Sequence, residues 1–190
     1  PSDSGRFIAL LLLAASVIAA VSLRYVHVHD SKELHHDGGI SLLAATGHLA
    51  AYAPAVYGGL TERWVEAAEW KRLIRSEPGF AFRRIGRDLS AYDIHPPLYF
   101  WLLHVWMKWT GDDLPGVFML NAVLGGLTAL FIFLLANRIL VNATEASVVA
   151  ALWAVSPGAC LVSEPLRQYE IFCLLSVALI WTVFRVAGER

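Results

Sequence analysis

The sequence predicts an all-α integral membrane protein, a helical bundle, and three observations lead to this fold class. Of the 190 residues, 57% are apolar and 16% are charged, whereas a soluble domain carries about 25% charged residues. The mean hydropathy is +0.54. The charges are unevenly placed, because residues 24–93 hold nine of the 15 Lys and Arg and nine of the 16 Asp and Glu. Long uncharged runs fill most of the remainder, which excludes a disordered, collagen-like or disulfide-rich chain.

Four runs are apolar and long enough to cross a bilayer, for which about 20 residues are needed. They are residues 7–23, 114–137, 146–163 and 168–187. Near the end of the last run, Arg185 can extend its side chain to the membrane surface. The first run has an alternative interpretation as a cleaved secretory signal, because Ala20 and Ser22 suit the small positions before a cleavage site.

Residues 95–110 form a shorter apolar run that we expect to lie in the membrane interface. His104 and Lys108 interrupt it, and it is rich in Trp; aromatic residues and Lys favour the headgroup level. If the run does not cross, four Arg residues fall on one side, as the positive-inside tendency requires. These are Arg6, Arg138, Arg185 and Arg190. The alternative, a fifth span, would separate the last three from Arg6.

This topology predicts one membrane domain over residues 1–190, with a helical loop at 24–94 and a tight turn at 164–170 on the outer face. In the loop, apolar residues at helical spacing predict helices over 38–52 and 61–75. Arg83, Arg84 and Arg87 follow as a basic patch. Such a patch either contacts anionic lipid headgroups or docks a lipid-linked phosphate.

A cluster of His and Asp follows the first span: His27, His29, Asp30, His35, His36 and Asp37. Imidazole and carboxylate are ligands of zinc and manganese, and Asp can also serve as a general base. His35, His36 and Asp37 are therefore the candidate metal ligands. No cofactor is assigned beyond a divalent cation that these three would hold.

Two further clusters suit an anionic ligand. Asp93 and His95 precede two prolines that open the 95–110 helix, where free backbone N–H groups favour an anion. The alternative is a simple helix start signal. The turn at 164–170 contains Glu164, Arg167, Tyr169 and Glu170. Charged side chains next to the hydrocarbon core are costly, so they indicate a functional site. The alternative for this turn is a Glu164–Arg167 ion pair that neutralises its own charges at the membrane boundary and binds no ligand.

Three motifs resemble those of bacterial GT-C membrane glycosyltransferases, the relatives of protein O-mannosyltransferases and lipid A aminoarabinose transferases. The most specific is Asp93-x-His95-Pro96-Pro97-Leu98-Tyr99-Phe100, followed by Leu102-Leu103-His104-x-Trp106. The others are Ser163…Arg167-x-Tyr169 and His36-Asp37-Gly38-Gly39-Ile40-Ser41-Leu42-Leu43. Order and spacing agree along essentially the whole chain. Gly38 stands where the family often has a second acid, and Glu164 lies one residue further from Arg167 than the acid of the family motif.

The resemblance implies transfer of a sugar from a polyprenyl-phosphate carrier to an acceptor on the outer face. It implies that Asp37 is the base that deprotonates the acceptor, with Asp93 and Glu164 as further catalytic candidates. The expected donor-binding residues are His95, Tyr99, Arg167 and Tyr169, together with Arg83 and Arg84. Because such enzymes have about ten or more spans, the chain is expected to be the amino-terminal part of a longer enzyme in the bacterial inner membrane, with its main loop in the periplasm.

Two other functions remain open at this stage. One is a non-catalytic accessory subunit of a larger membrane complex, because Asn121, Gly125 and Gly126 in one span suit close helix contacts. The other is a metal-dependent membrane enzyme built on the His27–Asp37 cluster. The expected partners are the lipid-linked sugar donor, membrane lipids and other membrane subunits. A net charge of −1 gives no reason to expect nucleic acid.

Overall fold

The computed structural model describes residues 3–31, 34–52, 64, 66–163 and 166–188, and in these ranges the only regular structure is helical. The chain divides into two compact units, Pro1–Lys32 with Asn121–Arg190, and Glu33–Leu120. We call them the long-helix unit and the loop unit, and each is described by itself. The predicted single domain over 1–190 stays a prediction.

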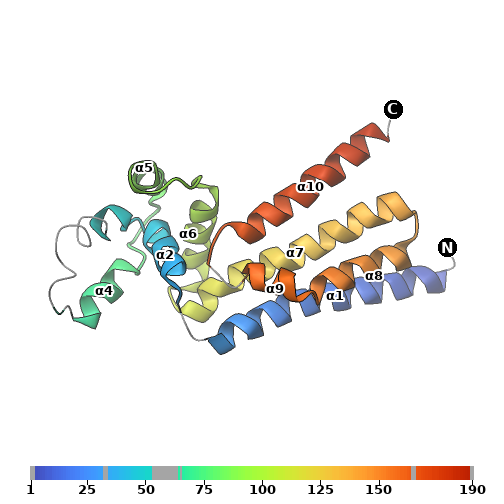
Figure 1. The fold of residues 1–190 in the computed structure, drawn as a ribbon, viewed down its shortest axis with the longest axis horizontal. Helices are drawn as coiled ribbons and strands as arrows, with labels where there is room; N and C mark the ends of the chain where they lie inside the picture. Colours follow the sequence, from blue (N-terminus) through green and yellow to red (C-terminus); the bar gives the residue numbers. More distant parts are fainter. Residues whose placement is uncertain (1–2, 32–33, 53–63, 65, 164–165, 189–190) are drawn as a thin grey trace. The chain divides into compact units, whose positions relative to one another are not determined.

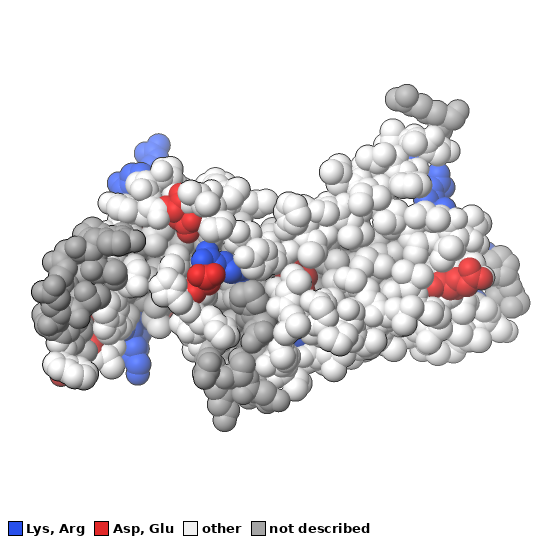
Figure 2. All heavy atoms as spheres, viewed as in Figure 1, with Lys and Arg blue, Asp and Glu red and all other residues white. Residues whose placement is uncertain are grey.

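The long-helix unit contains α1 (Asp3–Ser31), most of α7 (Leu114–Leu140), α8 (Ala143–Ala154), α9 (Pro157–Ser163) and α10 (Tyr169–Ala187). Helix α1 packs along α8 and α9, and α10 packs on α9. Figure 1 shows α1, α7 and α8 running alongside one another. On the face in Figure 2, few charged side chains lie over the middle of these helices.

Three helices are long and apolar enough to cross a membrane: Ser4–His27, Leu114–Leu140 and Tyr169–Ala187. Helices α8 and α9 together make a fourth candidate, bent by 58°. This confirms the all-α membrane fold class. The run predicted at 146–163 corresponds to this bent pair, because the helix breaks at Val155 and Ser156, before Pro157. Proline has no backbone N–H to continue the helical hydrogen bonds.

Close contacts between α1 and α7 depend on two glycines. A Cβ at Gly126 would lie 2.6 Å from Val21 Cγ2, and one at Gly125 would collide with the Arg24 side chain. Asn121 in α7 donates a hydrogen bond from Nδ2 to the Ser163 carbonyl, at 3.4 Å. These residues, which suggested an accessory subunit, therefore make contacts inside this chain.

The loop unit is built from α2 (His36–Thr46), α4 (Ala67–Leu73), α5 (Phe82–Tyr92) and α6 (Leu98–Thr110). Helices α2, α5 and α6 pack on one another. Their shared core is apolar and almost fully buried; it includes Leu42, Ile85, Leu89, Phe100 and Leu103. Helix α5 was not predicted from the sequence, although Phe82, Ile85 and Leu89 have helical spacing.

The helix boundaries in the loop unit differ from those predicted. Helix α2 ends where Gly47 adopts φ +77°, so the predicted 38–52 helix is divided there. Helix α4 covers Ala67–Leu73; the predicted start at 61 lies outside the described residues. Helix α6 begins at Leu98, after Pro97. With 13 residues, α6 is about 20 Å long at 1.5 Å per residue, less than the roughly 30 Å of a bilayer core.

Candidate donor-binding site

The segment before α6 fixes the imidazole of His95. Asp93 Oδ1 accepts a hydrogen bond from the Ile94 N–H at 2.6 Å and contacts His95 Nδ1 at 2.5 Å. The side chains of Asp93 and His95 are 11% and 28% exposed. A carboxylate at Nδ1 makes that nitrogen a donor and fixes the orientation of the ring. Asp93, a predicted catalytic residue, thus orients His95 in this structure.

Tyr99 lies in the first turn of α6 and is only 1% exposed. Its ring meets Phe100 edge-on, with the centroids 5.6 Å apart. The structure therefore shows Tyr99 as a core residue of the loop unit. Its predicted contact with the donor stays a prediction.

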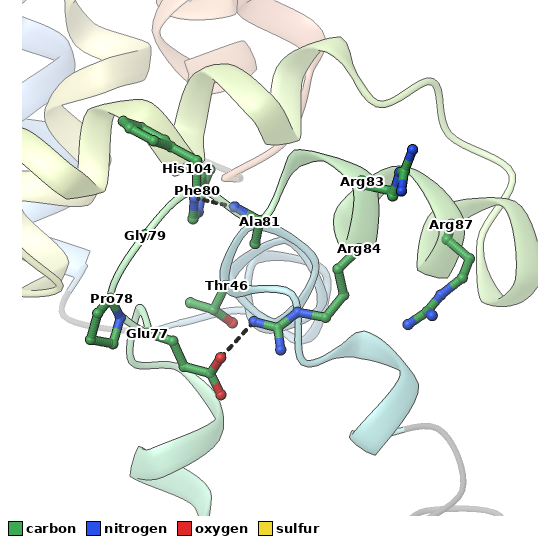
Figure 3. A pocket seen from close by; sticks show the side chains of 10 residues that line it. All are labelled: Thr46, Glu77, Pro78, Gly79, Phe80, Ala81, Arg83, Arg84, Arg87 and His104. Carbon is green, nitrogen blue, oxygen red and sulfur yellow. Dashed lines mark hydrogen bonds and ion pairs between the residues drawn. The ribbon is translucent and has the colours of Figure 1, made fainter.

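A cavity of about 450 Å³ lies between α2, the segment 77–81, α5 and α6. We call it the arginine pocket, because Arg83, Arg84 and Arg87 all line it from α5 (Figure 3). Arg84 and Arg87 lie three residues apart and share a helix face, whereas Arg83 points away from Arg84 in Figure 3. Glu77 is the acidic residue among those lining the pocket.

Glu77 partly neutralises the arginine pocket. Its Oε2 accepts from Arg84 Nη2 at 2.8 Å, and its Oε1 lies 3.2 Å from His48 Nε2. The hydrogen bond from Arg84, and secondly that from His48, lowers the pKa of Glu77. Arg87 Nη2 lies 3.2 Å from Oδ1 of Asp88, a residue that does not line the pocket. The lining keeps a positive excess, which suits a phosphate bound by two or more guanidinium groups.

His104 forms the inner end of the arginine pocket. Its Nδ1 lies 2.7 Å from the Ala45 carbonyl, and its Nε2 lies 3.1 Å from the Ala81 N–H. The first nitrogen therefore donates and the second accepts, which is the pattern of a neutral ring. Burial lowers the pKa of His104. Its function in the pocket is thus to join α2, α5 and α6 rather than to add charge.

Asp37 lies in the first turn of α2. Its carboxylate is 57% exposed, and its Oδ1 lies 3.6 Å from Nδ1 of His36, which is 77% exposed. The positive end of the helix dipole favours the charged carboxylate, as a base requires. Among the described residues, no three His, Cys, Asp or Glu side chains are placed to hold a metal ion. The metal set of His35, His36 and Asp37 therefore gains no support.

A fully buried ion pair, which the sequence alone did not predict, lies in the long-helix unit. Arg24 Nε lies 3.1 Å from Glu170 Oε1, and both side chains are 0% exposed. Ser163 Oγ donates to the same carboxylate oxygen. Arg24 looked like a charge flanking the first span, but α1 continues to Ser31. One feature of the sequence could have indicated this: no helix-breaking residue separates Arg24 from the uncharged run before it, so the helix can continue through Arg24.

Glu170 of this pair directly follows the turn that carries two predicted donor-binding residues. Arg167 is 7% exposed, whereas Tyr169, the first residue of α10, is 48% exposed. Glu164, the third candidate in the turn, lies outside the described residues. Glu170 is thus the acid that the structure shows beside this turn, with Arg24 as its partner.

The candidate residues are divided between the two units. Asp37, Arg83, Arg84, Asp93, His95 and Tyr99 belong to the loop unit, and Arg167 and Tyr169 belong to the long-helix unit. In the loop unit Asp93 contacts His95, and Arg83 and Arg84 both line the arginine pocket. The convergence of both groups on one donor stays a prediction.

Comparison with known proteins identifies the family. A family model described as dolichyl-phosphate-mannose-protein mannosyltransferase matches residues 94–190, slightly more than half of the chain. Neither the curated proteins nor the solved structures give a match. The matched region contains the His95-Pro96-Pro97 segment and the turn with Arg167 and Tyr169. The chain is therefore a membrane protein of the GT-C type that belongs to the dolichyl-phosphate-mannose-protein mannosyltransferase family.

Proposed function

We propose that this chain forms the donor side of an enzyme that transfers a sugar from a polyprenyl-phosphate carrier to an acceptor hydroxyl on the outer membrane face. The observation that carries the proposal is the family match over 94–190. The family implies glycosyl transfer from a polyprenyl-phosphate-linked sugar. The acceptor, the outer face and the residue roles are the parts that we add.

The proposed reaction is a displacement at the anomeric carbon of the sugar. The acceptor oxygen forms a bond to this carbon while the bond from the carbon to the phosphate oxygen breaks. The proton of the acceptor hydroxyl passes to the Asp37 carboxylate, and the phosphate leaves with the electron pair. Negative charge therefore grows on the phosphate, where hydrogen-bond donors stabilise the transition state. His95, Arg167 and the guanidinium groups of the arginine pocket are the proposed donors.

Replacing Asp37 tests the proposed base. Asn keeps the size of the side chain and removes its basicity, and a general base contributes about 10²–10⁴-fold to a rate. We expect Asp37→Asn in the full-length enzyme to lower kcat at least about 100-fold. Binding of the polyprenyl-phosphate donor should be unchanged, because Asp37 acts on the acceptor.

Glu66→Gln is the matched control, since it also replaces an exposed carboxylate of the loop unit by an amide. It should keep the rate of the parent enzyme. An Asp37→Asn enzyme with unchanged turnover would remove Asp37 from the mechanism. No turnover by the parent with any polyprenyl-phosphate sugar would contradict the proposed function itself.

A further inference from the structure

A second cavity lies wholly within the long-helix unit, and no described residue that was predicted from the sequence to bind the donor or to catalyse lines it. It has a volume of about 300 Å³, at the lower end of small-molecule sites. We call it the α8–α10 cavity. Its walls come from α8, the break after it, α9 and α10, and include Trp153, Ser156, Gly158, Val162, Glu170 and Cys173.

The wall residue Glu170 has an incomplete set of hydrogen bonds. Its Oε1 is occupied by Arg24 Nε and Ser163 Oγ. Its Oε2 is buried and has no partner among the described residues, and the same holds for Arg24 Nη2. Leaving a buried polar atom unpaired is unfavourable, and more so for a charged group. Such an atom in the wall of a cavity is therefore a position for a ligand.

The rest of the Arg24 side chain is fixed. Nη1 donates to the Ala20 carbonyl at 3.1 Å and to the Ala154 carbonyl at 3.3 Å. The guanidinium carbon lies 4.3 Å from the centre of the Trp153 ring. With Arg24 held in this way, Glu170 cannot rotate toward a new partner without losing the ion pair. The unpartnered oxygen is therefore held in a fixed position within a residue of the cavity wall.

The charge of the wall selects the chemistry of the ligand. Arg24 and Glu170 form a neutral pair, so a bound ion would leave an uncompensated charge where the dielectric constant is low. A hydroxyl group is neutral and donates to a carboxylate oxygen. Trp153, Gly158 and Val162 supply apolar surface for C–H groups. A sugar residue carries both hydroxyl groups and apolar C–H faces, and it is small enough for a cavity of this volume.

We propose that the α8–α10 cavity binds one neutral sugar residue, with Glu170 Oε2 accepting a hydrogen bond from a sugar hydroxyl. The assignment of that sugar to the donor or to the acceptor rests on the proposed function. The binding site itself rests on the cavity, the buried pair and the unpartnered oxygen. Cys173 in the wall of the same cavity provides a reporter.

The test measures alkylation of Cys173 in the full-length protein, reconstituted in lipid nanodiscs. A Cys160→Ser background removes the other thiol of this chain. The reagent is a small uncharged maleimide, and the probes are a polyprenyl-phosphate-linked sugar, polyprenyl phosphate alone, a neutral methyl glycoside and glycerol. We expect the first or the third probe to slow the reaction at least about threefold. Polyprenyl phosphate and glycerol should not slow it.

The pattern of protection distinguishes the sources of the sugar. Protection by the lipid-linked sugar assigns the cavity to the donor, and protection by the methyl glycoside alone assigns it to a sugar acceptor. Equal protection by polyprenyl phosphate with and without its sugar, or no protection by any sugar, overturns the inference. Protection by a methyl glycoside in a protein that transfers no sugar keeps this inference and contradicts the proposed function.

Two variants test the role of the wall. Glu170→Gln should abolish the protection, but it also leaves Arg24 without its charged partner and can impair folding. Gly158→Leu avoids this difficulty, because a Cβ at Gly158 meets only Ser156 Oγ, at 3.9 Å. We expect Gly158→Leu to fill the cavity and to abolish protection by sugar. Cys160→Leu, on the same helix outside the cavity lining, is the matched control and should keep it; equal behaviour of both overturns the inference.

Discussion

His104 joins three helices through the two nitrogens of one imidazole ring. It belongs to α6, its Nδ1 donates to a carbonyl of α2, and its Nε2 accepts from the N–H of Ala81, which precedes α5. No side chain caps α5 at Ala81, so this bond satisfies one of the free N–H groups of that helix end. The sequence places His104 in a motif but gives no sign of these backbone partners, because they come from residues distant in the chain.

The protonation of His104 predicts how stability depends on pH. Burial lowers its pKa below the ordinary value of 6.5, so the unfolded chain binds more protons at mildly acidic pH. The contribution of His104 is therefore complete above pH 6.5, and it is lost as the pH falls toward the lowered pKa. We expect the Tm of the protein in detergent to fall between pH 7.5 and pH 5.5, as measured by thermal unfolding.

His104→Gln provides the comparison, because its amide also has one donor and one acceptor but does not titrate in this range. The decrease in Tm with acid should be smaller in this variant. His104→Leu leaves both backbone groups unpaired and should be destabilised by about 1–3 kcal/mol at all pH values. Equal pH dependence of the parent and the His104→Gln variant would show that other groups cause it.

The three guanidinium groups of α5 permit a second test at the residue scale. If the arginine pocket binds the carrier phosphate, removing two of its charges should weaken binding. We expect Arg83→Gln combined with Arg87→Gln to raise the Kd for polyprenyl phosphate at least about tenfold, measured with nanodiscs of neutral lipid. The ion pair of Arg84 with Glu77 is left intact in this variant.

Arg72→Gln combined with Lys71→Gln removes the same charge from α4, outside the pocket. This control should bind polyprenyl phosphate like the parent. A loss of equal size in both variants would indicate a general attraction of the loop unit to anions. It would contradict a specific phosphate site.

At the scale of helices, the Arg24 side chain satisfies a backbone carbonyl at the bend between α8 and α9. Pro157 supplies no N–H, so the helix ends and the Ser156 N–H turns to the Trp153 carbonyl at 3.1 Å. The Ala154 carbonyl at the break accepts from Arg24 Nη1 instead. The proline predicts a break, but the residue that satisfies the broken end lies 130 positions away. Sequence patterns of a single helix cannot reveal such a partner.

Gly125 tests this arrangement, because its lack of a Cβ admits Arg24. An alanine there would collide with the Arg24 side chain, and overpacking of this kind costs about 1–3 kcal/mol. We expect Gly125→Ala to lower the Tm in detergent. Gly158→Ala, which meets only a distant hydroxyl, should keep or raise the Tm, since alanine is the better helix former. Equal stability of the two variants would contradict the close α1–α7 contact.

For the whole molecule, hydropathy was sufficient to predict the membrane fold class and three of the spanning helices, because each of these depends on one uninterrupted apolar run. The family was predictable from the segment Asp93–Phe100, whose prolines and polar residues are adjacent in the chain. The Arg24–Glu170 pair and the two cavities were not predictable. Each of them depends on side chains from several helices, and one sequence does not specify those contacts.

The membrane topology is the last prediction, and it follows from counting the spans. Helix α6 is too short to cross, so the chain should cross at α1, return at α7, cross again at α8–α9 and return at α10. Residue 36 and residue 169 then face the outer side, and residue 145 faces the inner side.

The measurement is labelling of intact cells with a membrane-impermeant maleimide, using single Cys substitutions at His36, Tyr169 and Glu145 after Cys160 and Cys173 are replaced by Ser. His36→Cys and Tyr169→Cys should label, whereas Glu145→Cys should label only after the membrane is opened. Labelling of His36→Cys without Tyr169→Cys would mean that α6 crosses or that the bent α8–α9 pair turns back on one side. In either case Asp37 and Arg167 could not act on the same phosphate, because the bilayer would lie between them.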